Sequence, residues 1–242
     1  MIGLGTLINV AAIVAGAAIG SLIGHKFSPS LRTLTTDVLG LITAVSAALS
    51  VSVITSTNLL DDIGSTWPIF VVLFSLLIGG FLGSLLQIES RLESLGETLK
   101  RKMSTSESNF VIGFVTASLV FCIGPLAIMG AFDDAMGLGI DKLVLKSTLD
   151  FFASIAFAAS FGWGVAFSAL SVGVYQAIFT GVGFALGNVW DEVQVSALTV
   201  VGGLMLFGIS LKLLNIRHIA IGNLIPALFL APYAVVLARF FT

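Results

Sequence analysis

The sequence predicts an all-α polytopic membrane protein with about eight transmembrane helices. The chain has 242 residues, of which 57% are hydrophobic and only 10% charged, and its mean hydropathy is +1.10. A soluble domain has about 25% charged residues, so this chain has too little charge to cover a water-facing surface. Its apolar runs are about 20 residues long, which suits helices crossing a hydrocarbon layer of ~30 Å rather than the shorter alternating strands of a barrel. The lipid bilayer is therefore the first predicted partner.

Eight apolar segments fit the hydropathy pattern. In chain order, their predicted ranges are 3–24, 35–54, 67–87, 110–132, 143–161, 165–186, 193–214 and 219–241. A polar loop at 56–66 follows the second segment. Residues 88–103 differ from the rest, because Ile88, Leu92 and Leu95 recur at helical spacing with charged residues on the other faces. This pattern predicts an interfacial amphipathic helix, which serves as a connector or, alternatively, docks a partner.

Lysine and arginine are concentrated in alternate loops, which predicts the orientation of the chain. The loops after the first, third and seventh segments hold most of them: Lys26, Arg32, Arg91, Lys100, Arg101, Lys102, Lys212 and Arg217. The opposite loops are acidic. The positive-inside rule then places the basic loops in the cytoplasm and both termini outside, provided that the number of spans is even. Lys142, Lys146 and Arg239 are exceptions to this pattern.

The predicted organisation is a single membrane domain over residues 1–242. Within it, short matches suggest two half-repeats, 1–87 and 165–241, on either side of central spans at 110–161. Asn9-x6-Gly16 in the first segment matches Gln176-x6-Gly183 in the sixth, an odd number of spans away. Halves separated in this way have opposite orientations, as in the inverted repeats of secondary transporters. Because the chain has 26 glycines, chance matches are the alternative explanation.

A glycine stripe runs along the first segment. Gly16, Gly20 and Gly24 are spaced by four residues, so they lie on one face of a helix. Small residues at this spacing allow two helix backbones to approach closely. We expect the contact to lie within one chain, while a homo-oligomer interface is the alternative.

Asp150 is the first candidate for a functional site. It lies about seven residues inside the fifth segment, roughly 10 Å deep at 1.5 Å per residue. Ser147 and Ser154, at i−3 and i+4, share its face of the helix. An acid on a hydroxylated stripe within a membrane span predicts a solute, cation or proton pathway. The alternative is a structural ion pair with Lys146, one turn earlier.

A helix break and three amides complete the predicted pathway. Gly124-Pro125 interrupts the fourth segment, either as a discontinuous helix at a binding site or as a packing kink. Asn9, Gln176 and Asn223 are amides within apolar segments. They line the site in the functional interpretation and join helices by hydrogen bonds in the structural one.

Two acids and several absences complete the prediction. Asp133 and Asp134 end the fourth segment, where they form an outer vestibule or are merely solvated. His25 and His218 have no cysteine or carboxylate at metal-ligand spacing, so we expect no metal and no cofactor. Hydrolase and phosphate-loop motifs are absent from the sequence, and we expect no enzymatic activity. The net charge of −2 argues against a nucleic acid as partner.

The chain resembles a known family, the domain of unknown function 554 family of YqgA/YdfK-type bacterial inner-membrane proteins. The resemblance covers nearly the whole chain in order and rests on five stretches: Gly5-Thr6-Leu7-Ile8-Asn9, residues 88–96, residues 113–124, residues 146–150 and residues 222–228. It implies a multi-pass protein of the bacterial inner membrane, with no established substrate.

These observations leave three hypotheses about function. The leading one is a secondary transporter of a small polar solute or ion, coupled to protons or sodium through Asp150. A passive channel for ions or solutes is the second, and a membrane scaffold that recruits a partner through residues 88–103 is the third.

Overall fold

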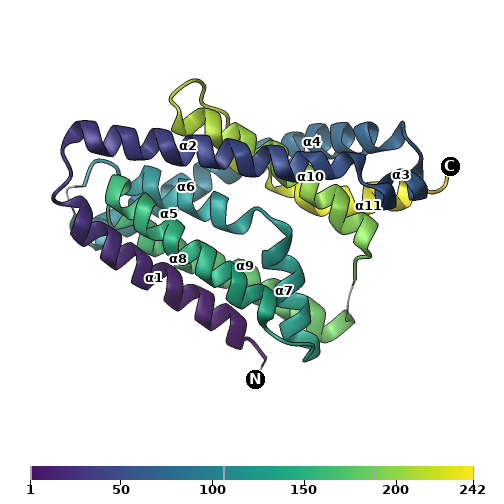
Figure 1. Ribbon diagram of the computed structural model, residues 1–242, viewed down its shortest axis with the longest axis horizontal. Helices are drawn as coiled ribbons and strands as arrows, with labels where there is room; N and C mark the ends of the chain where they lie inside the picture. Colours follow the sequence, from purple (N-terminus) through teal and green to yellow (C-terminus); the bar gives the residue numbers. More distant parts are fainter. Residues whose placement is uncertain (1, 106, 188, 242) are drawn as a thin grey trace. The chain divides into compact units, whose positions relative to one another are not determined.

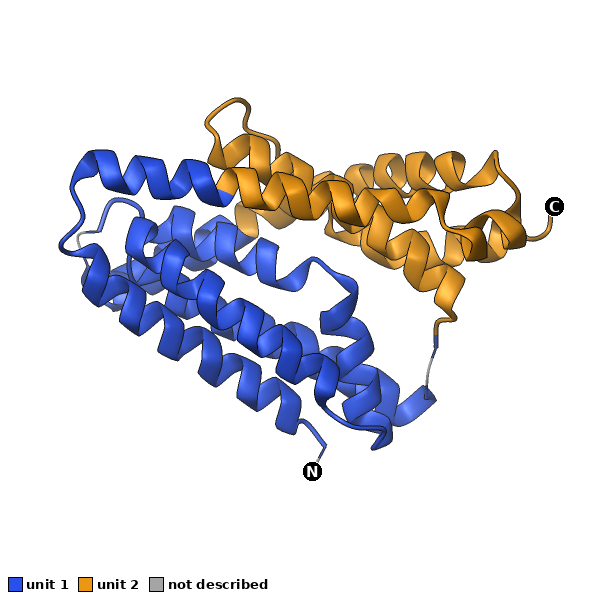
Figure 2. Cartoon of the chain, in the orientation of Figure 1, with its two compact units in different colours: residues 1–39, 92–189 blue, residues 40–91, 190–242 orange. Residues whose placement is uncertain are grey.

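The computed structural model describes residues 2–105, 107–187 and 189–241, and every regular element in them is helical (Figure 1). In this part of the chain, seven helices are long and apolar enough to cross a membrane. A pair of shorter helices, bent by 62° at a break, makes an eighth span if it is counted as one. The chain forms two compact units, residues 1–39 with 92–189 and residues 40–91 with 190–242 (Figure 2). Each unit is described separately below.

The first unit contains the start of the chain and its middle. Its elements are α1 (Leu4–Gly24), the first part of α2 (Pro29–Ser52), most of α5 (Ile88–Lys102), α6 (Phe110–Cys122), α7 (Pro125–Met136), α8 (Asp141–Phe161) and α9 (Gly164–Leu186). The predicted spans at 3–24, 143–161 and 165–186 match α1, α8 and α9 within two residues at each end. The amphipathic helix predicted at 88–103 is α5, with Lys100, Arg101 and Lys102 in its last turn.

Helices α1 and α8 pack closely along the glycine stripe. A Cβ atom added at Gly16, Gly20 or Gly24 would meet the backbone carbonyl of Phe151, Ile155 or Ala159, respectively. The residue numbers rise together with a constant offset, so the two helices run parallel, as Figure 1 shows. The predicted contact within one chain is therefore confirmed. Close backbone approach of this kind is how small residues stabilise helix pairs in membranes.

The second unit combines the remaining part of α2 with the end of the chain. It contains η1 (Val53–Thr55), α3 (Thr57–Ile63), α4 (Trp67–Leu85), α10 (Glu192–Leu213), η2 (Ile221–Leu224) and α11 (Ile225–Ala238). Helix α2 begins at Pro29, several residues before the predicted start at 35, and α3 lies within the segment 56–66 that was predicted to be only a loop. The eighth segment is a 3₁₀ turn followed by α11, because Pro226 lies in the first turn of α11.

Helices α4 and α11 pack in opposite directions. A Cβ at Gly79 would contact Ala227, and one at Gly83 would overlap the carbonyl of Asn223, so the residue numbers run against each other. These two helices are the third and eighth predicted spans, which take corresponding places in the proposed half-repeats 1–87 and 165–241. The repeat itself stays a prediction, as do the single domain and its half-repeat boundaries.

The three exceptions to the charge pattern all have acidic partners. Lys142 Nζ lies 2.7 Å from Asp133 Oδ2, and Lys146 Nζ lies 2.5 Å from Asp150 Oδ2. Arg239 pairs with two carboxylates of the second unit. These cations are largely neutralised where they lie, so they oppose the predicted orientation less than unpaired charges would.

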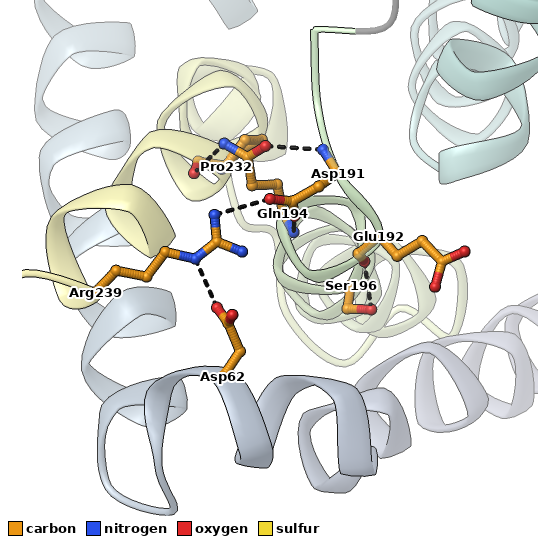
Figure 3. Close-up of polar contacts among 7 residues, drawn as sticks. All are labelled: Asp62, Asp191, Glu192, Gln194, Ser196, Pro232 and Arg239. Atoms are coloured by element: carbon orange, nitrogen blue, oxygen red, sulfur yellow. Dashed lines mark hydrogen bonds and ion pairs between the residues drawn. The ribbon is translucent and has the colours of Figure 1, made fainter. Parts of the chain in front are cut away.

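Arg239 joins three elements of the second unit (Figure 3). Its Nε donates to Asp62 of α3 at 2.7 Å, and its Nη1 donates to Asp191, the N-cap of α10, at 2.8 Å. Asp191 also accepts from the backbone N–H of Gln194, whose side chain accepts from the Asp191 N–H in a complete capping box. The Gln194 amide donates onward to the carbonyl of Pro232 in α11. Asp62 and Asp191, which belong to the acidic loops, therefore link α3, α10 and the end of α11 through Arg239.

We expect the Asp191 carboxylate to stabilise the second unit only above acidic pH. Partial burial opposes its charged form, but hydrogen bonds from Arg239 and Gln194 outweigh burial and lower the pKa of Asp191. Its stabilisation is therefore complete above the unfolded-state pKa of about 3.9 and is lost as pH falls through the lower folded-state pKa.

Asp191→Ala should lower the free energy of unfolding at pH 7 by about 1 kcal/mol, because it removes the helix cap. Asp191→Asn keeps a capping side chain and should cost less. Thermal unfolding in detergent, measured between pH 3 and pH 7, tests both variants against Glu192→Gln, which alters the adjacent exposed acid. Equal melting temperatures for Asp191→Ala and Glu192→Gln would contradict this role.

Candidate functional site

The break between α6 and α7 gives the first unit a discontinuous helix. Helix α6 ends at Cys122, Ile123 is extended, and Gly124 adopts φ +145° before Pro125 opens α7. A residue with a side chain rarely adopts this φ, and proline has no N–H to continue the helix of α6. The 62° bend therefore follows from the local sequence, which predicted an interruption here, while a binding site at the break stays a prediction. Helix ends of this kind carry backbone groups without intrahelical partners.

A buried ion pair lies beside the last turn of α6. Lys146 and Asp150 are one turn apart on α8, and only 7% and 6% of their surfaces are exposed. The Lys146 Nζ lies 6.0 Å from the ring centre of Phe121, the residue before Cys122. The structural alternative for Asp150, an ion pair with Lys146, thus occurs in the structure. It does not lie at a helix end, however, because Asp150 is about 13 Å along α8, near its midpoint.

Burying the Lys146–Asp150 pair costs free energy, and polar groups that are costly to bury in a membrane helix are often functional. Removing two charges from water costs several kcal/mol per ion, and the attraction between them often only offsets that cost. The pair also has further polar neighbours. The Cys122 thiol lies within electrostatic range of Lys146 and Asp150, and the Tyr175 hydroxyl of α9 lies within range of that thiol. The Tyr175 hydroxyl is buried and has no hydrogen-bond partner among the described residues.

Asn9 of α1 and Gln176 of α9 are the most unusual residues of the first unit. Both are 0% exposed, and all four of their side-chain polar atoms lack hydrogen-bond partners in the described part of the chain. Buried polar groups in folded proteins are nearly always paired, because an unpaired one costs about 1–3 kcal/mol. The described residues therefore do not form the hydrogen bonds between helices that the structural explanation of these two amides requires. Their role in a solute or ion pathway stays a prediction.

The helix registers place both amides at about the level of the ion pair along α8. A Cβ at Gly5 would touch Leu143, so Asn9, one turn further along α1, lies at the level of Ser147 on the parallel α8. A Cβ at Gly173 of α9 would touch Val10. Helix α9 returns antiparallel to α8 after the turn at 162–163, so Gln176 lies within about one turn of Asn9.

The serines of α8 contribute unequally to this polar region. Ser147 Oγ donates to the Leu143 carbonyl of its own helix at 2.6 Å. Ser154 is 0% exposed and its hydroxyl has no partner among the described residues. It lies against Gly16, so it faces α1. Thr6 of α1, which is not among the predicted site residues, adds another buried hydroxyl without a described partner. We call Asn9, Gln176, Lys146, Asp150 and Ser154 the central polar cluster.

Asp133 and Asp134 have partners of their own. Asp134 is buried and its Oδ2 accepts from the backbone N–H of Gly5 at 3.0 Å, in the first turn of α1. A carboxylate in this position satisfies a free N–H and complements the positive end of the helix dipole. Asp133 forms the ion pair with Lys142. The outer vestibule stays a prediction, while the observed role of Asp134 is to tie α7 to α1.

Asn223, the third predicted amide, lies in the second unit and has partners there. Its Oδ1 accepts from the backbone N–H of Glu89 at 3.0 Å. The Glu89 carboxylate in turn accepts from the N–H of Gly222 and lies 3.7 Å from Lys212 Nζ. Glu89 is only 5% exposed, although it looked like one charge among many on an amphipathic helix. No sequence pattern distinguishes it from the exposed acids of α5.

The central polar cluster offers hard oxygen donors together with one cation. Carboxylate, amide and hydroxyl oxygens are ligands that suit sodium and other hard cations, and they also hydrogen-bond polar solutes. Asp150 adds a group that can take up a proton. These residues therefore have the chemistry to hydrogen-bond a polar solute and to compensate a charge near the middle of a membrane helix.

The comparisons with known proteins agree with this description of a membrane protein. The profile of the family described as "Protein of unknown function (DUF554)" matches residues 4–236. The uncharacterized membrane protein YdfK of Bacillus subtilis strain 168 is 29% identical over 231 residues, which cover 96% of this chain and 95% of that protein. The uncharacterized protein YqgA of Escherichia coli K12 is 24% identical over 233 residues, 94% of each chain. No solved structure matches this chain.

Proposed function

We propose a transport function for this chain, which belongs to the family of proteins of unknown function DUF554. The chain is a multi-pass membrane protein. The proposal is a secondary transporter, without enzymatic activity, that moves a small polar solute or ion across the bacterial inner membrane. The resemblance to bacterial membrane proteins supports this location, and a discontinuous helix beside buried charges supports transport.

The observation that carries the proposal is the unpaired state of Asn9 and Gln176. Four amide atoms without described partners, in side chains that are 0% exposed, are costly unless a polar ligand or ion satisfies them. Both amides lie within a few turns of the Lys146–Asp150 pair. A solute that enters there finds hydrogen-bond donors and acceptors and a fixed pair of opposite charges.

Asp150 is the coupling residue in this proposal. A proton or a sodium ion that binds Asp150 weakens its attraction to Lys146 and releases the ammonium group. The pair therefore has two electrostatic states that a gradient of the coupling ion biases. Such a change beside the α6–α7 break is the kind of local event that alternating access requires.

The amides provide a test in which transport and stability move in opposite directions. Asn9→Leu and Gln176→Leu replace unpaired polar groups by apolar groups of similar size. Each should abolish transport while raising the free energy of unfolding by about 1 kcal/mol, because the cost of an unpaired amide disappears. The control is Ser168→Ala, also in α9, whose buried hydroxyl already donates to the Val165 carbonyl.

The measurement uses purified protein in liposomes. A trapped pH-sensitive dye reports proton flux and radioactive sodium reports sodium flux, each with and without small amino acids, carboxylates or amines outside. Gradient-dependent flux that disappears in both leucine variants supports a coupled transporter. Flux without a coupling gradient indicates a channel, and wild-type flux in both variants rules out this binding site. Loss of stability in both variants would mean that the amides are structural.

A further inference from the structure

A polar cavity lies in the first unit, at the C-terminal end of α8. Its volume is about 230 Å³, and it forms where α1 and α8 end and where α2 and α6 begin. Polar residues from all these segments line it, including Ser21, Arg32, Glu107, Asn109 and Ser160. Drug-sized ligands occupy pockets of about 300–1,000 Å³, so this cavity suits a smaller solute.

Two opposite charges face this cavity without forming an ion pair with each other. One guanidinium nitrogen of Arg32 donates to the Gly24 carbonyl at 2.8 Å, at the end of α1. The Glu107 Oε2 accepts from the backbone N–H of Trp163 at 3.0 Å, after the end of α8. Within the described residues, neither side chain has an ion-pair partner. Each is thus held in place by one backbone contact and keeps hydrogen-bonding capacity for a ligand.

Two buried hydroxyls also line this cavity. Ser21 is 3% exposed and Ser160 is 2% exposed, and neither hydroxyl has a hydrogen-bond partner in the described part of the chain. Unpaired hydroxyls in a cavity are expected to be satisfied by what occupies it. They are independent of the two charges, since they come from α1 and α8 rather than from α2 and the segment before α6.

We propose that this cavity binds a small zwitterionic solute of the α-amino-acid class. Arg32 binds the carboxylate, for which its planar guanidinium has matching geometry, and Glu107 binds the ammonium group. Ser21 and Ser160 supply the remaining hydrogen bonds. A simple anion would be repelled by Glu107 and a simple cation by Arg32, so only a solute with both charges satisfies both residues. This binding site is separate from the central polar cluster and does not require the transport proposal.

The wild-type protein in detergent tests the ligand class directly. Isothermal titration with glycine, L-alanine and L-serine should give saturable binding. N-acetylglycine lacks the ammonium group and glycine methyl ester lacks the carboxylate, so each should bind at least about tenfold more weakly than glycine. Equal binding of N-acetylglycine and glycine would overturn the role of Glu107. No binding of any amino acid would mean that the cavity holds only water and would refute the proposal.

Two variants then assign the charges. Glu107→Gln should remove the preference for glycine over N-acetylglycine, and Arg32→Gln should remove the preference over the methyl ester. A folding defect would weaken every ligand alike and would not produce this crossed pattern. Lys26→Gln is the matched control, because Lys26 is a neighbouring exposed cation outside the cavity lining. Unchanged preferences in Glu107→Gln and Arg32→Gln would contradict the assignment.

The failure of this proposal is distinguishable from the failure of the proposed transport. Asn9→Leu and Gln176→Leu alter the central polar cluster and leave the cavity lining unchanged, so glycine should bind both variants with wild-type affinity. Binding that disappears in these leucine variants would place the solute in the central polar cluster and overturn the assignment to this cavity.

Discussion

Gly20→Ala is expected to destabilise the first unit by roughly 1–3 kcal/mol, at the upper end of this range, although it adds a single methyl group. A Cβ at Gly20 would overlap the backbone carbonyl of Ile155 in α8. A side chain in that position could rotate away, but a helix backbone cannot move without displacing its own hydrogen-bonded neighbours. Relief of the overlap therefore requires α1 and α8 to separate along the whole glycine stripe.

The matched control for Gly20→Ala is Gly181→Ala, which adds the same methyl group at a position with free space. Gly181 lies in α9, and a Cβ there would have no atom within 4 Å. Alanine has a helix preference over glycine of about 0.5–1 kcal/mol, so this substitution should be neutral or stabilising. Melting temperature and the yield of monodisperse protein in mild detergent measure both effects. Similar melting temperatures for the two variants would show that the stripe does not require glycine.

Neutralising only one member of the Lys146–Asp150 pair should cost about 3–5 kcal/mol of unfolding free energy. Asp150→Asn leaves the buried Lys146 ammonium without a counterion, and Lys146→Met leaves the Asp150 carboxylate in the same position. The double variant has no buried charge, so it should recover most of the lost stability. This pattern is a double-mutant cycle with a large favourable coupling energy.

The partly exposed ion pair of the same unit, Lys142–Asp133, is the control for this cycle. Lys142 and Asp133 are 39% and 25% exposed, so neutralising one of them should cost at most about 1 kcal/mol. The double variant of the buried pair also separates structure from transport. It should fold like the wild type and yet show no ion-coupled flux, because the titratable group is gone. If the double variant is as unstable as Asp150→Asn, the pair is not the source of the cost.

Most of the helices could be predicted because each is defined locally. A run of about 20 apolar residues has few alternatives in a membrane, so the predicted segments for α1, α8, α9 and α10 agree with the structure within two residues. The α6–α7 break was equally predictable, since Gly124 and Pro125 act on their own backbone. The polar segment at 56–66 was harder, because the short α3 has no strong periodicity.

The sequence showed which polar residues of the candidate site stand out, but it did not show which partners they have. Asn9, Gln176 and Asp150 were recognisable because polar residues are rare in apolar segments. Asn223 satisfied the same criterion, yet its partner is Glu89, more than 130 residues earlier in the chain. Arg239 and Lys142 are exceptions to the predicted distribution of basic residues, and only the structure shows that each has an acidic partner.

The sequence by itself determined that this is a helical membrane protein, where its helices run, and which polar residues are costly to bury. These properties depend on hydrophobicity and backbone preferences that act within one turn or one span. Only the tertiary structure decided that Lys146 and Asp150 are paired, that Asn9 and Gln176 have no described partner, and that Arg32 and Glu107 face one cavity. These contacts depend on the registers between helices. The registers are set where glycines pack against backbone carbonyls of helices far away in the sequence, and no local sequence pattern predicts them.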